Sequence, residues 1–148
     1  MQTNPILQAI HDRRAVRHYR KDPVPKEMVD VIIDAGRMAP SAMNRQPWHF
    51  HVLDDAESIL FLSAAVVKEG KLPIAKEGLR EAIHAIFHPG SFHLKDALDF
   101  LQKDDPVFHG APLVIFLSAP NNNHWASLDI GMCSENMMLA ANSLGLAS

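Results

Sequence analysis

Apolar residues recur at helical spacing in several stretches of the chain. Asn4 can cap a first helix, with Pro5 at its first helical position. A second helix is expected to open at Pro25 and to carry one apolar stripe. The longest helical pattern covers residues 125–144, and Gly145 is placed to terminate it. The pattern therefore predicts helices near both ends of these 148 residues.

Two other stretches have the pattern of β-strands. Residues 48–53 alternate along the chain, which is strand periodicity. Residues 112–119 contain a continuous apolar run, the pattern of a fully buried central strand. Between them, Asp54 or Asp55 can cap another helix, and residues 72–104 are helical in parts. Two strands among several helices predict an α+β fold, with helices packed on both faces of a small sheet.

The composition is that of one globular domain over residues 1–148. Apolar residues make up 47% and charged residues 21%, so disorder is not expected. The net charge of −3 argues against binding to nucleic acid or to an anionic membrane, which needs a basic surface. The single cysteine, Cys133, excludes an internal disulfide framework and fits a reducing cytoplasm. No apolar run approaches the roughly 20 residues that cross a bilayer, so we expect a soluble cytoplasmic protein.

Arg13, Arg14 and Arg17 concentrate three guanidinium groups within five residues of this slightly acidic chain. An anion would relieve that concentration of charge. The planar fork of arginine suits a phosphate in particular, because it can donate two parallel hydrogen bonds. The alternative is a solvated end of the first helix, where cations interact favourably with the helix C-terminus.

A second polar stretch, residues 40–48, has the sequence PSAMNRQPW. It offers the hydroxyl of Ser41 and the amides of Asn44 and Gln46 on a chain stiffened by two prolines. Such groups can bind the polar edge of a flat heterocycle, while stiff backbone keeps the ordering cost low. The alternative is a loop in which Ser41 and Asn44 only satisfy local backbone groups. Together with the arginines, this stretch indicates a phosphorylated planar cofactor.

These two stretches, the run over residues 105–112 and the helix over residues 136–146 occur in one order. In that order they resemble the nitroreductase family of FMN-dependent oxidoreductases, from Ile10 onward. The resemblance implies a three-layer α-β-α sandwich, in which helices flank a small, mainly antiparallel sheet, and an intertwined homodimer. Family members generally continue beyond the position of Ser148, so the C-terminal part of the domain is expected to be missing here. Residues 72–104 are the expected lid over the substrate.

The resemblance also assigns roles to the arginine cluster. Arg13, Arg14 and Arg17 are implied to lie along the phosphate and ribityl chain of FMN. Positive charge near the flavin ring would favour its reduced, anionic form. Ala15 departs from the family, in which serine is common at this position, but its backbone N–H can still bind phosphate.

The polar loop is implied to cross from the partner subunit and complete the flavin pocket. The active unit would then be a homodimer with two equivalent sites, each shared across the interface. The loop residues to which the resemblance assigns cofactor contacts are Pro40, Ser41, Ala42 and Asn44.

The implied activity is electron transfer from NADH or NADPH to nitroaromatic, quinone or similar conjugated acceptors by a ping-pong mechanism. FMN performs this chemistry, so no catalytic side chain is named. One alternative is a flavin-binding protein without turnover. Another is a family member with a different flavin reaction, such as reductive dehalogenation. An arginine-dependent nucleic-acid binder would bind in a strongly salt-dependent way, and the acidic net charge argues against it.

Other chemistries have little support in the sequence. The nine histidines form no metal-binding motif with a supporting acidic residue, and Cys133 has no companion ligand. Cys133 lies in an apolar helix, where a small buried thiol is the ordinary expectation. The chain has no Gly-x-Gly-x-x-Gly motif, which fits a nicotinamide that only visits the site.

Overall fold

The computed structural model describes residues 4–67 and 105–148. Its contacts divide the chain into two compact units, Met1–Asp54 with Ala111–Ser148, and Asp55–Gly110. The expected lid, residues 72–104, lies outside the described residues. A single domain over the whole chain stays a prediction.

Helices α1 (Pro5–Asp12) and α2 (Lys26–Arg37) of the first unit begin where the sequence predicts. The side chain of Asn4 accepts a hydrogen bond of 2.9 Å from the N–H of Ile6, so it caps α1. Pro25 precedes α2, as expected, because a proline needs no hydrogen bond at a helix start. Both helix starts are therefore encoded locally.

Helix α5 (Ala126–Ser143) is the longest described helix and ends at the predicted glycine. Gly145 has a φ of 76°, and its N–H donates to the carbonyl of Asn142 at 3.0 Å. The N–H of Leu146 donates to the carbonyl of Ala141 at 2.9 Å. This pair of bonds is a Schellman motif, which needs a left-handed residue after the cap and so favours glycine.

Strands β1 (His49–Leu53) and β2 (Val114–Ser118) pair antiparallel, with Phe50 opposite Leu117. Both predicted strands and the α+β class are thereby confirmed. The expectation that β2 is a fully buried central strand is wrong for the described residues, since most of its side chains are half-buried. In the part of the chain that the structure describes, β2 also pairs along one edge only, so it is not a central strand there.

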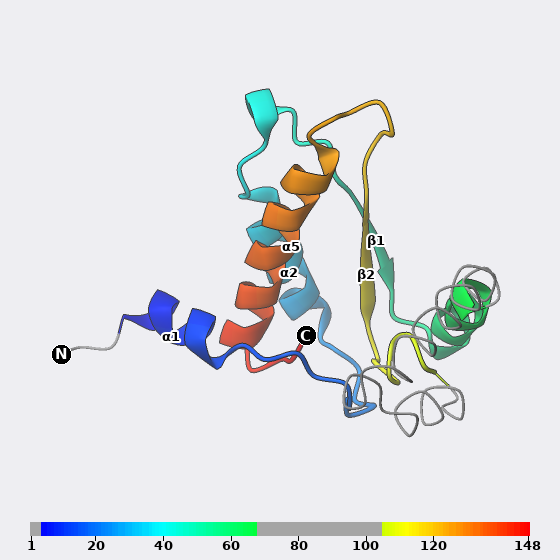
Figure 1. Ribbon diagram of the computed structural model, residues 1–148. Helices are drawn as coiled ribbons and strands as arrows, with labels where there is room; N and C mark the ends of the chain where they lie inside the picture. The colour runs from blue at the N-terminus through cyan, green and yellow to red at the C-terminus, as the bar shows by residue number, and fades with distance from the viewer. Residues whose placement is uncertain (1–3, 68–104) are drawn as a thin grey trace, which may run out of the picture. The chain divides into compact units, whose positions relative to one another are not determined.

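The hydrophobic core of this unit lies between the sheet and the helix pair α2 and α5, which run side by side in opposite directions (Figure 1). Phe50, Ile115 and Leu117 face this core from the two strands. His49 and His51 lie on the opposite face and are exposed, so burial alternates over residues 49–51. The alternation ends at Val52, which is exposed although it shares the face of Phe50. The buried residues of the core are Ile32, Ala39, Trp48, Cys133, Met137 and Ala141.

In the second unit, residues 56–67 are helical and follow Asp55, one of the two residues predicted as the cap. The carboxylate of Asp55 accepts a 2.8 Å hydrogen bond from the N–H of Ser58. Deeper in this helix, the hydroxyl of buried Ser63 donates to Oδ1 of Asp105 at 2.6 Å. The helix is thereby tied to the turn that begins at Asp105.

Candidate functional site

The arginine cluster lies on extended chain immediately after α1. Arg13 closes the helix, and its N–H donates to the carbonyl of Ala9 at 3.1 Å. Nη1 of Arg14 donates to the carbonyls of His11 and, at 2.8 Å, of Arg13. Within residues 4–67 and 105–148, no carboxylate lies at ion-pair distance from these guanidinium groups or from that of Arg17. Their positive charge is therefore not neutralised by these parts of the chain.

The C-terminal part of the described chain holds this segment in place. The N–H of Val16, between Arg14 and Arg17, donates to the carbonyl of Ser148 at 3.1 Å. The hydroxyl of Tyr19 donates to the carbonyl of Val16 at 2.8 Å. Burial raises the pKa of Tyr19, and the positive charge of Arg17 opposes this rise. The segment is thus fixed by backbone bonds, while its guanidinium groups stay accessible.

The polar loop contains a short 3₁₀ turn, η1 (Ala42–Asn44), with an unusual backbone. Met43, Asn44 and Gln46 have positive φ angles of 55°, 53° and 47°. Non-glycine residues adopt this left-handed region at a cost of roughly 1–2 kcal/mol each. Oγ of Ser41 accepts the N–H of Gln46 at 2.9 Å, and Nε2 of Gln46 donates to Oδ1 of Asn44 at 2.9 Å. Such strain persists only where surrounding contacts hold it, and it clusters at binding sites.

The loop satisfies local groups, as the alternative interpretation expected, and still has donors to offer. Ser41 and Asn44 both act as acceptors in the bonds described above. In the part of the chain that the structure describes, the hydroxyl proton of Ser41 and Nδ2 of Asn44 have no acceptor. Asn44 is exposed and Ser41 half-exposed. A ligand that brings acceptor atoms could therefore bind both groups without breaking a local bond.

Asp129, in the first turn of α5, forms a hydrogen bond to the backbone of the loop. Its Oδ1 accepts the N–H of Ala42 at 3.0 Å, and the residue is only 1% exposed. Sequence reasoning did not identify Asp129. In the sequence, Asp129 is simply an acidic residue in the first turn of a helix. Acidic residues are common there because they interact favourably with the helix dipole, so the sequence does not set Asp129 apart.

The two predicted half-sites lie at opposite ends of α5 (Figure 1). Asp129 contacts the loop at the helix start, whereas Asn142 donates from Nδ2 to the carbonyl of Ala9, at 3.3 Å, near the helix end. These two residues are thirteen positions apart, which corresponds to roughly 20 Å along the axis at about 1.5 Å per residue. One chain therefore does not bring the arginine cluster and the loop together.

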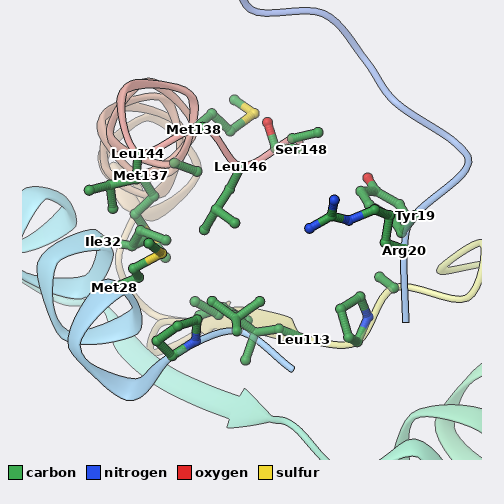
Figure 2. Close-up of a pocket in the computed structure, with 18 of the residues that line it drawn as sticks. Tyr19, Arg20, Met28, Ile32, Leu113, Met137, Met138, Leu144, Leu146 and Ser148 are labelled. Carbon is green, nitrogen blue, oxygen red and sulfur yellow. The ribbon is translucent and has the colours of Figure 1, made fainter. Parts of the chain in front are cut away.

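A cavity of about 870 Å³ lies elsewhere in the same unit, between α2, α5, β2 and the segment that contains Tyr19 and Arg20 (Figure 2). Tyr19 and Arg20 form one side of it, and Met28 and Ile32 of α2 lie across from them. None of the eight predicted cofactor residues lines this cavity. Its wall is mainly apolar and includes Leu113, Ile115, Leu117, Met137, Leu144 and Leu146.

Cys133 is fully buried in the core, where burial raises the pKa of its thiol. The thiolate is the reactive form, so this cysteine is suited to packing, as predicted. Within residues 4–67 and 105–148, no three His, Cys, Asp or Glu side chains are grouped as metal ligands. None of the helices in those two stretches combines the length and the apolar character needed to cross a membrane.

Several known proteins are similar to this chain in sequence and in fold. The nitroreductase NfnB of Mycolicibacterium smegmatis is 32% identical over 156 residues, covering 94% of this chain and 67% of the relative. An FMN-dependent nitroreductase from Clostridium difficile superposes with a TM-score of 0.74 at 26% identity, covering 99% of this chain and 59% of that structure. A nitroreductase from Bacteroides fragilis, solved with bound FMN, has a TM-score of 0.68 at 26% identity, covering 98% and 68%.

The chain therefore spans about three fifths to two thirds of the length of these proteins. The structural likenesses confirm the predicted nitroreductase-like α+β fold. The nitroreductase family matches residues 10–148, which is nearly the whole sequence. On these grounds, the chain belongs to the nitroreductase family.

Proposed function

We propose that this protein is an FMN-dependent oxidoreductase, located in the cytoplasm, that uses NADH or NADPH to reduce nitroaromatic, quinone or similar conjugated acceptors. The observation that carries the proposal is the guanidinium cluster of Arg13, Arg14 and Arg17, which no carboxylate neutralises within the described residues. An accessible cation cluster of this kind suits a phosphate. The FMN named for two of the structural neighbours supports the choice of ligand.

The donors of the chain fit the two chemically different parts of FMN. The guanidinium groups match its phosphate, which carries nearly two negative charges, and the backbone N–H of Ala15 adds a neutral donor there. The hydroxyl of Ser41 and Nδ2 of Asn44 match the carbonyl and nitrogen acceptors of the flavin ring. Pro40 and Ala42 complete this part of the proposed site. When bound, FMN supplies hydride acceptance from the nicotinamide and onward electron transfer in separate half-reactions, which is a ping-pong sequence.

A homodimer reconciles the two half-sites with their separation. In one chain, Asp129 next to the loop and Asn142 next to the end of α1 lie roughly 20 Å apart along α5. In a two-fold dimer whose copies of α5 run in opposite directions, the loop of one subunit approaches the arginine cluster of its partner. Each flavin site then takes its phosphate donors from one subunit and its ring-edge donors from the other. The acceptor molecule binds the flavin face that remains open.

The role of the protein is binding and orientation. Donors fixed at the phosphate and at the ring edge of FMN hold one face of the flavin toward the incoming nicotinamide. The two rings then meet in a defined orientation. The stiff, strained loop keeps its donors in place before the ligand arrives, so little ordering entropy is lost on binding.

The test is to denature the purified protein, identify any released flavin, and reconstitute the apoprotein with FMN. We expect a flavin absorption band that bleaches on anaerobic addition of NADH or NADPH and returns on addition of a nitroaromatic compound or a quinone. A band that does not bleach would indicate a flavin-binding protein without turnover. Halide release from a halogenated acceptor would indicate reductive dehalogenation. A protein that neither carries nor takes up FMN would reject the proposal.

A further inference from the structure

We propose that Asp129 is a positioning residue that holds the Ser41–Asn44 loop in the shape required for cofactor binding. Its Oδ1 accepts the N–H of Ala42 at 3.0 Å across 87 positions of sequence. Ala42 is the first residue of η1 and directly precedes the strained residues Met43 and Asn44. The inference deepens the proposed function and rests on it for the identity of the ligand.

The burial of Asp129 is not explained by stability. The residue is 1% exposed, and its Oδ2 is buried without a hydrogen-bond partner among residues 4–67 and 105–148. A buried carboxylate with an unsatisfied oxygen is costly, and an apolar side chain of similar size would avoid that cost. Its place in the first turn of α5 lowers the cost only in part, through the helix dipole. What an apolar side chain could not provide is the acceptor for Ala42.

The geometry explains why the loop needs this acceptor. Asn44 and Gln46 are bonded to each other and to Ser41, so these bonds shape the loop internally without fixing it to the rest of the fold. The bond from Ala42 to Asp129 ties it to α5, the helix whose other end contacts α1 through Asn142. Asp129 thereby fixes the position of the donor groups of Ser41 and Asn44 relative to α5.

A matched control is available on the same helix. Nδ2 of Asn136 donates to the carbonyl of Ala35 at 3.1 Å, which ties α5 to α2. Like the bond from Ala42 to Asp129, it is partly buried and joins a side chain to distant backbone. It does not involve the loop. Asn136→Ala therefore removes a comparable tertiary bond without touching the proposed site.

The experiment compares Asp129→Leu, Asp129→Ala, Asp129→Asn and Asn136→Ala in the full chain. Three quantities are measured for each: amide hydrogen exchange at Ala42, the Kd for FMN from flavin fluorescence, and the urea unfolding midpoint. The leucine variant fills the volume of the lost carboxylate, so it is expected to fold even if the alanine variant does not. The asparagine variant keeps one acceptor oxygen for Ala42.

We expect Asp129→Leu to speed exchange at Ala42 and to raise the Kd for FMN, each by about tenfold or more, without lowering the unfolding midpoint. Asp129→Asn should stay within about threefold of the wild type in both measures, and Asn136→Ala should lower the midpoint while leaving both unchanged. Unchanged exchange at Ala42 in the leucine variant overturns the inference, as does an equal rise of the Kd in Asn136→Ala. If the wild type itself binds no FMN, the proposed function fails, whereas the exchange measurement still decides whether Asp129 holds the loop.

Discussion

Gly36 of α2 and Met137 of α5 approach each other so closely that no side chain fits at the glycine. A Cβ atom placed on Gly36 would lie 2.8 Å from Cγ of Met137 and 3.1 Å from Sγ of Cys133. The absence of a side chain therefore lets the two helices pack at this point. This contact joins the C-terminal end of α2, which leads into the polar loop, to the central part of α5.

Gly36→Ala is expected to lower the free energy of unfolding by up to about 2 kcal/mol. Alanine gains about 1 kcal/mol over glycine in a helix, whereas overpacking a dense core costs roughly 1–3 kcal/mol. Urea unfolding measures the difference. Gly131→Ala in α5 is the control, because a Cβ there meets nothing within 4 Å and should stabilise the protein. Equal stabilisation by the two substitutions would contradict the inference that Gly36 packs too tightly against Met137 for a side chain to fit.

Alanine substitution at Arg13, Arg14 or Arg17 is expected to raise the Kd for FMN by roughly 10- to 100-fold. Each removes charge-assisted hydrogen bonds worth about 1.5–3 kcal/mol. Fluorescence titration with FMN measures the effect, and riboflavin, which lacks the phosphate, should bind these variants and the wild type alike. Arg20→Ala is the control, since its exposed guanidinium is already paired with Asp22 at 3.0 Å. An equal loss of FMN affinity in Arg20→Ala would contradict the proposal that the arginine cluster binds the phosphate.

Two defective variants are expected to restore flavin sites when they are combined. One variant carries Arg13→Ala with Arg17→Ala, and the other carries Ser41→Ala with Asn44→Ala. In a mixed dimer, one site is built wholly from intact segments and the other wholly from altered ones. After the two are unfolded and refolded together, mixed dimers should bind about one FMN per dimer with wild-type affinity. If mixed dimers form but bind no FMN tightly, each site is built within one chain.

Asp105→Asn is expected to destabilise the protein at neutral pH by about 1–3 kcal/mol, because an amide cannot accept at both oxygen positions. Burial raises the pKa of Asp105, but hydrogen bonds from Ser63 and from the N–H groups of Phe108, Gly110 and Val107 together lower it below 3.8. A carboxyl group whose pKa is lowered by folding stabilises the protein above its unfolded pKa. That stabilisation is lost as the pH falls through its folded pKa.

The difference between wild type and Asp105→Asn should therefore shrink below a pH of about 3.8. Urea unfolding between neutral pH and about pH 2 measures it. Asp54→Asn, which alters an exposed carboxylate, provides the control. A difference that stays constant across this range would show that the carboxylate of Asp105 is not stabilised by these bonds.

The outcome at particular residues shows how far sequence patterns reach. Asn4 and Gly145 were predicted at helix ends, and Asp54 or Asp55 was predicted as a further cap. Asn4, Asp55 and Gly145 form the expected local bonds, because a cap depends only on neighbours a few positions away. The partial burial of β2 was not predicted, since burial depends on which other segments cover a strand. Asp129 was missed because its partner, Ala42, lies 87 positions earlier in the chain.

The sequence by itself determined the helices of the described residues, the two strands, the arginine cluster, the polar loop and the resemblance to the nitroreductase family. Only the tertiary structure decided that the cluster and the loop lie at opposite ends of α5, and that the buried carboxylate of Asp129 accepts a hydrogen bond from Ala42. The physical reason is that periodicity and capping arise from neighbours within a turn or two, whereas packing selects a partner from anywhere in the chain.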